Sequence, residues 1–401
     1  MRICEVVNAG FVAGGAERSV KLIAEGMRDR GHEVLVVATD VRLREDDIAE
    51  SDLFADVLIP AVGRSLSQRL TGYFWNRRAY REIRSVLDTF KPDLVHFHTI
   101  GEFSPSVLAA SSRVPRVMTV HGPEDWTLRL LKWHLLSSAN PNLSRFLRLR
   151  DWAQLYYFRL IQRPAYLPWI RRLDLILTPS AFMAESIRPD IGRVQIQVLP
   201  HGTVLMKPSP IRGAGNLLFV GRLEPVKGAN VLIRAFDIAA SNQPDAHLVI
   251  VGEGSQRKEL EDLAHALGRA DRITFTGWLS SDQLRSRYDE CAVVAIPSIW
   301  PENFPMVALE ALAVGRPILA TRVGGMAELV SDQENGLLVE PNDVAALADA
   351  IGTMLADRGL MQRMALRSAG RADQYDPDHF LNQLEGIYES LVCADETRSS
   401  R

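Results

Sequence analysis

Short apolar runs alternate with longer segments of helical periodicity along most of this 401-residue chain. The runs are apolar with little interruption, which is typical of strands buried on both faces of a parallel sheet. The segments between them carry apolar residues three and four positions apart, as the inner face of a helix does. The predicted strands are 3–7, 33–38, 94–97, 116–120, 175–178 and 195–199 in the first half, and 217–220, 247–251, 273–275, 292–296, 317–320 and 336–339 in the second. The predicted helices are 16–29, 76–90, 229–240, 256–267, 305–314 and 343–356, and a further helix follows Pro377.

This alternation predicts βα units and therefore a doubly wound α/β fold with parallel sheets. Each half has enough strands for its own sheet, so we expect two Rossmann-like domains that face each other across a cleft. Residues 201–215 contain Pro208, Pro210, Gly213 and Gly215 without a periodic pattern, which indicates a linker. We expect an N-terminal domain over 1–205 and a C-terminal domain over 206–375. We also expect the helix within 376–401 to pack back on the N-terminal domain, ahead of a polar tail.

The amino-acid composition indicates the compartment in which the protein is located. An apolar fraction of 47% is ample for two cores, and the three cysteines (Cys4, Cys291 and Cys393) are too few and too scattered for a disulfide framework or a zinc cluster. A reducing, cytoplasmic location is the simplest inference. The opening MRICEVVNAG has a carboxylate, Glu5, inside its apolar run, so we interpret it as a first strand and not as a secretory leader. Cys4 and Cys291 lie in apolar runs and are expected to be buried.

Charge is distributed unevenly. The first 200 residues carry 27 Lys and Arg against 22 Asp and Glu, whereas the remainder carries 19 against 27. Basic and aromatic residues gather in residues 64–84 (Arg64 to Arg84) and 126–172 (Trp126 to Arg172), and the second segment holds four of the seven tryptophans. Such segments suit an anionic membrane surface at the inner face of a membrane. The alternative is that these helices pack on their own domain with solvated arginines. The overall charge does not favour nucleic acid as a partner.

The loop and helix around Glu302 and Glu310 carry the clearest chemistry. Glu302 follows a predicted strand, and Pro305 suits the first position of the helix that contains Glu310. The free N–H groups of a helix start bind phosphate, and carboxylates accept hydrogen bonds from hydroxyl groups. Two carboxylates flanking such a start therefore suit a nucleotide sugar. Taken in isolation, two glutamates at this spacing are more often solvated surface residues.

Two cations follow the first strand of the second half. Arg222 and Lys227 bracket a short loop that opens a helix, an arrangement that suits a diphosphate. They can neutralise the charge of a departing nucleoside diphosphate without a metal. No clustered acidic pair suited to Mg²⁺ is evident in the sequence, so we expect no metal and no other cofactor. Surface salt bridging is the alternative for these two cations.

Other strand ends carry glycines, an aromatic residue and histidines. Gly14 and Gly15 precede a helix, where backbone amides approach a phosphate or a sugar, although a plain tight turn is equally compatible. Gly252 ends one strand. Trp278 and Leu279 follow another, where backbone groups reach the edge of a nucleobase. Three histidines also lie at strand ends: His96, His98 and His121. Their spacing does not suit a metal site, and His96 and His98 have no partner that the sequence identifies.

With these residues in view, the chain resembles the retaining glycosyltransferases of family 4, which have the GT-B fold. The resemblance rests on GRLEPVKG, VGEG, PENFPMVALEALAVGRP and VGGMAELV in the second half, in that order. The first half matches more loosely, through GGAE, PDLVHFH, TVHG and LTPS. The resemblance implies that the second domain binds a nucleotide-diphosphate sugar and that the first domain binds the acceptor.

The resemblance also implies roles for single residues. Arg222 and Lys227 grip the diphosphate, and Glu310 binds the ribose hydroxyls. Glu302 contacts the hydroxyls of the donor sugar, together with the backbone of residues Asn303, Phe304, Pro305 and Met306. Of these four, all but Pro305 have an N–H group that can donate. His121 lines the reacting centre, and Gly14 with Gly15 lies against the diphosphate or the acceptor. Asn303 is a departure, because glycine is common at this position of the motif, although Asn tolerates left-handed backbone better than most residues.

The implied reaction is transfer of a hexosyl unit from a UDP- or GDP-sugar to a saccharide or a lipid-linked saccharide, in surface polysaccharide or glycolipid synthesis. The anomeric configuration is retained by a same-face substitution, in which the departing phosphate takes the acceptor proton. The catalytic residues would be His121, Glu302, Arg222 and Lys227. A nucleotide-sugar epimerase of the same fold and a non-catalytic sugar-nucleotide-binding protein stay open as alternatives.

Overall fold

The computed structural model describes residues 1–12, 14–40, 53–61, 72, 74–122, 152–153, 156–203, 208–211 and 215–399. The chain divides into two compact units. Unit 1 contains the described residues up to Gly202 and those from Pro377 onward, and unit 2 is Thr203–Asp376. The domain boundaries predicted from the sequence are 205/206 and 375/376, and the boundaries between the two units in the structure are 202/203 and 376/377.

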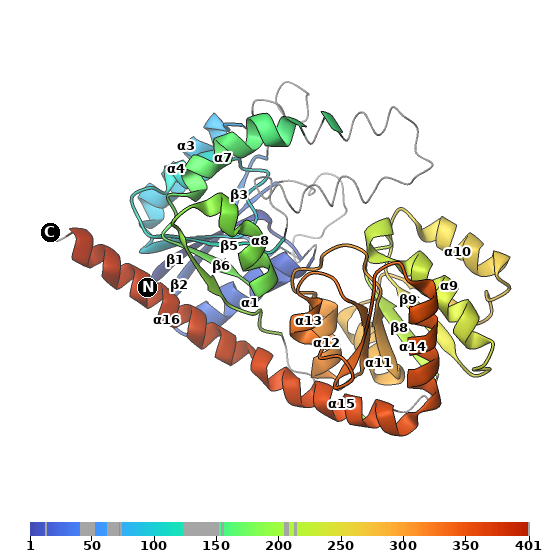
Figure 1. Ribbon diagram of the computed structural model, residues 1–401. Coiled ribbons are helices and arrows are strands. Elements are labelled where there is room, and N and C mark those ends of the chain that lie inside the picture. Colours follow the sequence, from blue (N-terminus) through green and yellow to red (C-terminus); the bar gives the residue numbers. More distant parts are fainter. Residues whose placement is uncertain are drawn as a thin grey trace. The chain divides into compact units, whose positions relative to one another are not determined.

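In the described part of unit 1, the strands form a seven-stranded parallel sheet in the order β3-β2-β1-β4-β5-β6-β7 (Figure 1). The strands are β1 (Arg2–Ala9), β2 (Glu33–Thr39), β3 (Val57–Ile59), β4 (Leu94–Phe97), β5 (Arg116–Thr119), β6 (Leu175–Thr178) and β7 (Gln195–Val198). The helices are α1 (Gly15–Asp29), α3 (Arg77–Phe90), α4 (Ser106–Ala110), the π-helical turn η2 (Phe158–Gln162), α7 (Arg163–Ile170), α8 (Ala181–Ile191) and α16 (Pro377–Ser399).

Helices cover both faces of this sheet, so unit 1 has two apolar cores. One core packs α3, α4, α7 and α8 on one face. The other packs α1 and α16 on the opposite face, with Phe380, Leu384 and Tyr388 of α16 buried there. The last helix of the chain thus returns to unit 1 and lies beside α1 (Figure 1).

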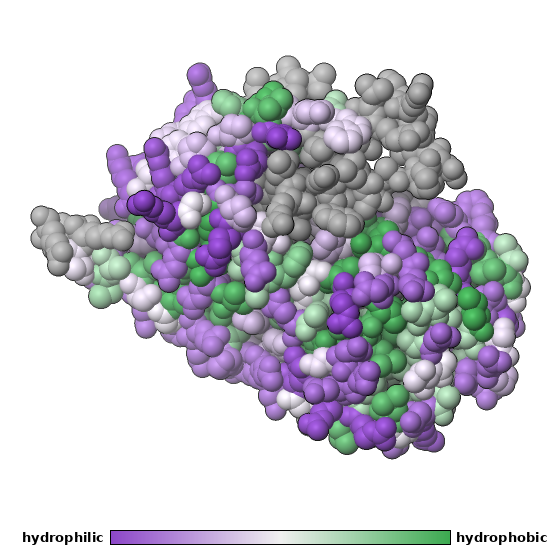
Figure 2. Space-filling view, in the orientation of Figure 1, coloured by the Kyte–Doolittle hydropathy of each residue, from purple (hydrophilic) through white to green (hydrophobic). Residues whose placement is uncertain are grey.

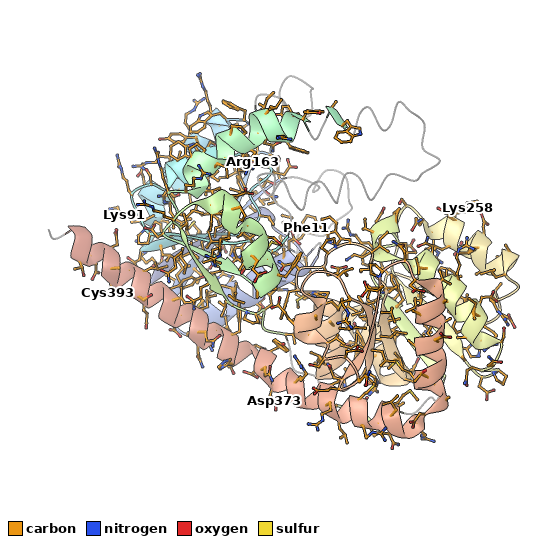
Figure 3. All side chains as sticks on the ribbon, in the orientation of Figure 1. Phe11, Lys91, Arg163, Lys258, Asp373 and Cys393 are labelled. Carbon is orange, nitrogen blue, oxygen red and sulfur yellow. The ribbon has the colours of Figure 1, made fainter. Side chains whose placement is uncertain are left out.

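Unit 2 repeats the architecture with a six-stranded parallel sheet among its described residues, in the order β10-β9-β8-β11-β12-β13. The strands are β8 (Asn216–Val220), β9 (His247–Val251), β10 (Ile273–Gly277), β11 (Val293–Ile296), β12 (Ile318–Thr321) and β13 (Gly336–Val339). The helices are the 3₁₀ turn η3 (Pro225–Lys227), α9 (Ala229–Ala240), α10 (Arg257–Ala266), α11 (Ser281–Glu290), α12 (Met306–Ala313), α13 (Met326–Leu329), α14 (Val344–Ala356), α15 (Arg358–Ala372) and the 3₁₀ turn η4 (Asp373–Tyr375). One core lies under α9 and α14, and the other under α12 and α13. Side chains fill the space between sheet and helices in both units (Figure 3).

The predicted doubly wound parallel folds are confirmed, since every predicted strand overlaps a strand of the structure. The elements β3, α4, α7, α8, α11 and α15 were not predicted from the sequence. β3 has only three residues, and α8 contains Pro189, which obscures its helical pattern. α11 is strongly polar and buries only Tyr288, so the periodicity that marks an amphipathic helix is missing.

The cysteines and the connecting segment follow the sequence pattern. Cys4 and Cys291 are buried, as predicted, and Cys393 is exposed on α16 (Figure 3). In the described part of the expected linker, the Thr203 amide donates to the Tyr375 carbonyl at 2.9 Å and the Ser209 hydroxyl donates to Asp289 at 2.7 Å.

Among the described helices, none has the length and apolarity needed to cross a bilayer. The visible surface of unit 2 mixes hydrophilic and hydrophobic residues (Figure 2).

Candidate functional site

The carboxyl ends of the strands in unit 2 bring most of the predicted residues to one edge of its sheet. β8 lies between β9 and β11, so the strand order reverses beside it. Ligands of doubly wound folds bind beyond the carboxyl ends of the strands at such a reversal. The loop after β8 carries Arg222 and Lys227, and the loop after β11 carries Glu302. The topology therefore places these side chains at the position where a ligand is expected.

A buried carboxylate joins these two loops. The Lys227 ammonium group lies 2.6 Å from Glu302 Oε1, and the Ser298 hydroxyl donates to the same oxygen at 2.6 Å. Glu302 is only 7% exposed. A Cβ at Gly228 would lie 2.0 Å from the Pro297 carbonyl oxygen, so glycine is needed for the two loops to approach this closely. Lys227, predicted to bind a diphosphate, and Glu302, predicted to bind a sugar, are thus direct partners here.

The backbone of the Glu302 loop is fixed from the next loop of the sheet. The Gly325 amide donates to the Glu302 carbonyl at 2.7 Å. Gly324 has φ +57, and a Cβ there would lie 2.0 Å from the same carbonyl oxygen. Phe304 packs edge-on against Tyr375 with ring centroids 5.7 Å apart, and Asn303 is buried. The conformation of residues 302–304 is therefore set by packing and hydrogen bonds on several sides.

α12 begins one residue later than predicted. Pro305 is the N-cap, with ψ 122, and Met306 is the first helical residue. A proline ring fixes φ but leaves ψ free, so Pro305 can precede the helix as readily as open it. Glu310 is 8% exposed, and the hydroxyl of the buried Tyr288 donates to its Oε2 at 2.6 Å. A fixed carboxylate therefore stands on the same helix whose first N–H groups lack helical partners.

The loop of Arg222 is held by the loop after β9. The Leu223 amide donates to the Glu253 carbonyl at 2.8 Å, and Ser255 donates to the Glu224 carboxylate at 2.7 Å. The Gly252 amide donates to the Gly277 carbonyl at 3.0 Å, which joins the ends of β9 and β10. The Arg222 side chain is exposed and has no hydrogen bond or ion pair with another described residue. Arg222 thus presents an exposed guanidinium on a loop that is hydrogen-bonded to its neighbour.

Trp278 and Leu279 follow β10 and differ in exposure. The Trp278 side chain is 68% exposed, whereas Leu279 packs against the core under α12. The strand order places Trp278 two strands away from β8 along the same sheet edge. Its indole is therefore open to solvent in unit 2.

Unit 1 holds the remaining predicted residues. Gly14 is the N-cap of α1 and Gly15 is its first residue. Gly14 has φ −171, an extended backbone that any residue adopts, so its torsion angle does not require glycine. His121 follows β5 and is half-buried.

His96 and His98 have partners in the structure that could not be named from the sequence. β1 and β4 pair in parallel with Glu5 opposite His96. His98 Nε2 lies 2.7 Å from Glu5 Oε2, and His98 Nδ1 lies 2.9 Å from His121 Nε2. His96 Nδ1 lies 2.6 Å from the Tyr388 hydroxyl, and its Nε2 lies 2.7 Å from the Thr119 hydroxyl. The histidines therefore belong to one buried polar cluster.

His201 and Tyr388 also belong to the cluster and were not predicted from the sequence. His201 Nε2 lies 3.2 Å from His121 Nδ1, and the Tyr388 hydroxyl donates to Glu5 Oε1 at 3.1 Å. Neither residue lies within a motif, and both reach the cluster only through the tertiary fold. Glu5 was visible as a carboxylate inside an apolar strand, which is a sign of a buried polar site.

Burial keeps the imidazoles of His96, His121 and His201 neutral. Loss of solvation lowers the pKa of His96 and His121 well below the usual value, with neighbouring histidines adding to the effect. Burial, with a smaller contribution from His98, lowers the pKa of His201 to about 3. Burial and the adjacent Glu5 raise the pKa of the Tyr388 hydroxyl.

Among the described residues, one group has the composition of a metal site. Glu5, His96 and His98 offer ligand atoms within 4.8 Å of one another. Each of these side chains is already hydrogen-bonded to Tyr388, Thr119, His121 or another member of the group. A metal would have to replace bonds that already satisfy the site. The expectation that the protein needs no metal stays a prediction.

The two basic aromatic segments lie only partly within the described residues. In their described parts, Trp75 and Trp169 pack with ring centroids 5.8 Å apart, so part of each segment packs within unit 1. Trp152, Tyr156, Leu160 and Ile161 are exposed instead. The segment 126–172 therefore contains both internally packed and exposed aromatic residues.

The lowered pKa values predict that unit 1 loses stability in mild acid. A histidine with a lowered pKa stays neutral when folded but takes a proton when unfolded, so protons favour the unfolded state as the pH falls below about 6.5. The loss is about 2 kcal/mol at pH 5 for each such histidine. Urea unfolding at pH 7.5, 6 and 5 measures the effect. His201→Gln should reduce the pH dependence relative to the parent, and an unchanged dependence in this variant would contradict the assignment.

Comparison with known proteins agrees with this architecture. The family model described as Glycosyltransferase Family 4 matches residues 13–205, and the one described as Glycosyl transferases group 1 matches residues 207–372. Among solved structures, sucrose-phosphate synthase from Thermosynechococcus elongatus is similar with a TM-score of 0.77 and 22% identity, covering 98% of this chain and 99% of that chain. HepE from Anabaena in complex with UDP is similar with a TM-score of 0.71 and 22% identity, covering 98% and 100%.

Curated relatives are similar over shorter stretches. D-inositol 3-phosphate glycosyltransferase from Nocardia farcinica is 35% identical over 246 residues, 56% of this chain and 54% of that protein. Glycogen synthase from Mycobacterium tuberculosis is 33% identical over 288 residues, 69% of this chain and 63% of that protein. The chain thus spans about half the length of the first of these relatives. Because the two family models together account for both units, the chain belongs to the family 4 glycosyltransferases of the GT-B fold.

Proposed function

We propose that this glycosyltransferase moves a hexosyl unit from a UDP- or GDP-sugar to a saccharide or lipid-linked saccharide, with retention of configuration and without a metal. The observation that carries the proposal is the bond of Lys227 to Glu302 beside β8 in unit 2. It puts a cation for phosphate and an acceptor for hydroxyls within 2.6 Å of each other. A nucleotide sugar carries a phosphate and sugar hydroxyls at adjacent positions, so it can bind both side chains.

The donor is proposed to bind as follows. Arg222 and Lys227 bind the diphosphate, and the first N–H groups of α12 add partial positive charge. Glu302 and its neighbours up to Met306 contact the sugar. Glu310, held by Tyr288, accepts hydrogen bonds from the ribose hydroxyls. The exposed Trp278 lies along the same sheet edge and offers an aromatic face to the base.

Relatives of the same fold inform the choice of nucleotide. HepE from Anabaena has been solved with UDP and with UDP-glucose. These complexes favour a UDP-sugar for this chain, and a GDP-sugar is the alternative.

The transfer is proposed to proceed on one face of the sugar. The acceptor hydroxyl oxygen forms the new bond to the anomeric carbon while the bond from that carbon to the diphosphate oxygen breaks, and the departing phosphate takes the hydroxyl proton. Arg222 and Lys227 stabilise the charge that develops on the leaving group. Glu302 already accepts two hydrogen bonds at 2.6 Å, which stabilise the carboxylate as an acceptor and weaken it as a nucleophile.

Unit 1 is proposed to bind the acceptor in the cytoplasm, at the inner face of a membrane. The exposed Trp152, Tyr156, Leu160 and Ile161 accompany Arg159 in the segment 126–172, which holds nine Lys and Arg against one acidic residue. Aromatic and aliphatic side chains next to arginines bind anionic lipid surfaces. A surface polysaccharide or a glycolipid is the product class that fits such a location.

A thermal-shift comparison of UDP, GDP and ADP tests the donor. UDP or GDP should raise the Tm with concentration, because a ligand that binds only the folded state stabilises it. Arg222→Ala should weaken the Kd for that nucleotide by tenfold or more, since a charge-assisted hydrogen bond contributes about 1.5–3 kcal/mol. Lys258→Ala, on the exposed face of α10, is the matched control. If none of the three nucleotides shifts the Tm, the proposal fails.

Loss of the Lys227 cation should reduce turnover far more than stability. Lys227→Ala should lower kcat by about 100-fold or more, the usual effect of removing one group that stabilises developing charge. The measurement is product formation from a radiolabelled UDP- or GDP-sugar, with the Tm measured alongside. Turnover at the parent rate would remove Lys227 from the mechanism. An epimerised donor would indicate an epimerase, and binding without turnover in the parent would indicate a binding protein.

Flotation with liposomes tests the membrane surface. The protein should float at low salt with vesicles that contain anionic lipid and stay in the soluble fraction with neutral vesicles, because binding depends on charge. Replacement of Leu160 and Ile161 by Ser should reduce flotation and leave the Tm unchanged, since both side chains are exposed. Equal behaviour with both kinds of vesicle would contradict the proposed surface.

A further inference from the structure

A continuous line of hydrogen-bonded side chains runs through unit 1. Ser19 Oγ lies 3.2 Å from His201 Nδ1, and His201 Nε2 lies 3.2 Å from His121 Nδ1. His121 Nε2 lies 2.9 Å from His98 Nδ1, and His98 Nε2 lies 2.7 Å from Glu5 Oε2. Each histidine uses both ring nitrogens. The line links a serine of α1 to a carboxylate of β1 through three imidazoles.

The chemistry of the end groups gives this line a direction. An ionised carboxylate only accepts hydrogen bonds, so His98 Nε2–H donates to Glu5. A neutral imidazole has one donor and one acceptor, so His98 Nδ1 accepts from His121 Nε2–H. His121 Nδ1 must then accept from His201 Nε2–H, and His201 Nδ1 accepts from the Ser19 hydroxyl. Every bond in the line is satisfied by this one arrangement when Glu5 carries its charge and the histidines do not.

Burial supports the neutral state of His121 and His201. Glu5, His96 and His98 are fully buried, and His201 is 5% exposed. The pKa values of His121 and His201 are lowered chiefly by burial, and so is the pKa of His96 in the same cluster. With this set of tautomers, a further proton on His98 or His121 would leave two N–H groups facing each other in one bond. Burial of His121 and the geometry of its two bonds therefore both favour a neutral ring at that position.

We propose that Glu5, His98 and His201 are positioning residues for His121, and that they hold it as the neutral Nε2–H tautomer with Nδ1 as a hydrogen-bond acceptor. The inference rests on the proposed function and on the role that the family resemblance implies for His121, at the reacting centre. A neutral ring there can accept a hydrogen bond from a saccharide hydroxyl in place of His201. A charged ring would oppose the positive charge that develops on the anomeric carbon during transfer.

The same cluster provides a control that lies off this line. The Thr119 hydroxyl bonds to His96, which bonds onward to Tyr388. Thr119→Val therefore removes one buried hydrogen bond of the cluster without removing a member of the line between Ser19 and Glu5. Glu5→Gln has nearly the same shape as the parent side chain, but its amide can donate where the carboxylate could only accept. That change permits the opposite direction along the whole line.

Nitrogen NMR of the full-length protein labelled with ¹⁵N-histidine tests the tautomers without any substrate. In the parent at pH 7.5, the resonances lost in His98→Gln, His121→Gln and His201→Gln should be those of neutral Nε2–H rings. Glu5→Gln should shift the His121 resonances toward the Nδ1–H form, and Thr119→Val should leave them in place. An Nδ1–H ring or an imidazolium at His121 in the parent would overturn the proposal, and this spectrum requires no Glu5 variant to fold.

Kinetics test the consequence, with hydrolysis of UDP-glucose, or of GDP-mannose if only GDP binds, as the probe reaction. Glu5→Gln should lower kcat by about 10- to 100-fold, as loss of a group that orients another side chain does, with little change in KM. Thr119→Val should retain the parent kcat. Parent-level kcat in Glu5→Gln, together with a reversed tautomer, would overturn the positioning role. Parent-level kcat in His121→Ala would instead show that the proposed function places His121 wrongly, even if the tautomers are as stated.

Discussion

The order of the parallel strands is the constraint on which the candidate chemistry of both units depends. In each sheet the first strand, β1 or β8, lies inside the sheet and its neighbours on the two sides come from different parts of the chain. The loop after β1 and the loop after β4 therefore start side by side at the carboxyl edge of the sheet in unit 1, and so do the loops after β8 and β11 in unit 2. Glu5 and His98 meet beside β1 and β4, and Lys227 and Glu302 meet beside β8 and β11. Each pair has a long sequence separation and is formed only when the sheet has the right order.

Buried polar bonds then fix the geometry at these positions. Arg316 is fully buried in unit 2, and it donates to the backbone carbonyls of Tyr288 and Ser209. Tyr288 in turn donates to Glu310. A buried polar group that loses its partner costs about 1–3 kcal/mol, so each bond of this series holds the next in place. The carboxylate proposed to contact ribose therefore depends on an arginine that does not itself face the ligand.

Much of the fold could be predicted from the sequence, because the strands of a doubly wound fold appear as uninterrupted apolar runs. The motif residues around Glu302 were also visible, since they follow strands and precede helices. The pairing of Lys227 with Glu302 was not visible, because it depends on how closely Gly228 lets two loops approach. The α11 helix escaped prediction because it buries only Tyr288, yet that one residue holds Glu310. His201 and Tyr388 escaped because their partners are far away in the sequence.

The two units apply different electrostatics at equivalent positions of their sheets. In unit 2 the groups beside β8 are charged, and the Arg222 guanidinium is open to solvent, which suits a ligand that carries a diphosphate. In unit 1 a line of buried imidazoles ends at the Glu5 carboxylate of β1, and burial lowers the pKa values of His121 and His201 in that line. Such a line orients hydrogen bonds without adding positive charge near neutral pH. A transfer reaction needs both properties, because the leaving group gains negative charge while the acceptor is an uncharged hydroxyl that must be aligned. In the proposed function, each requirement is met by a separate sheet edge, and neither set of residues has to compromise for the other.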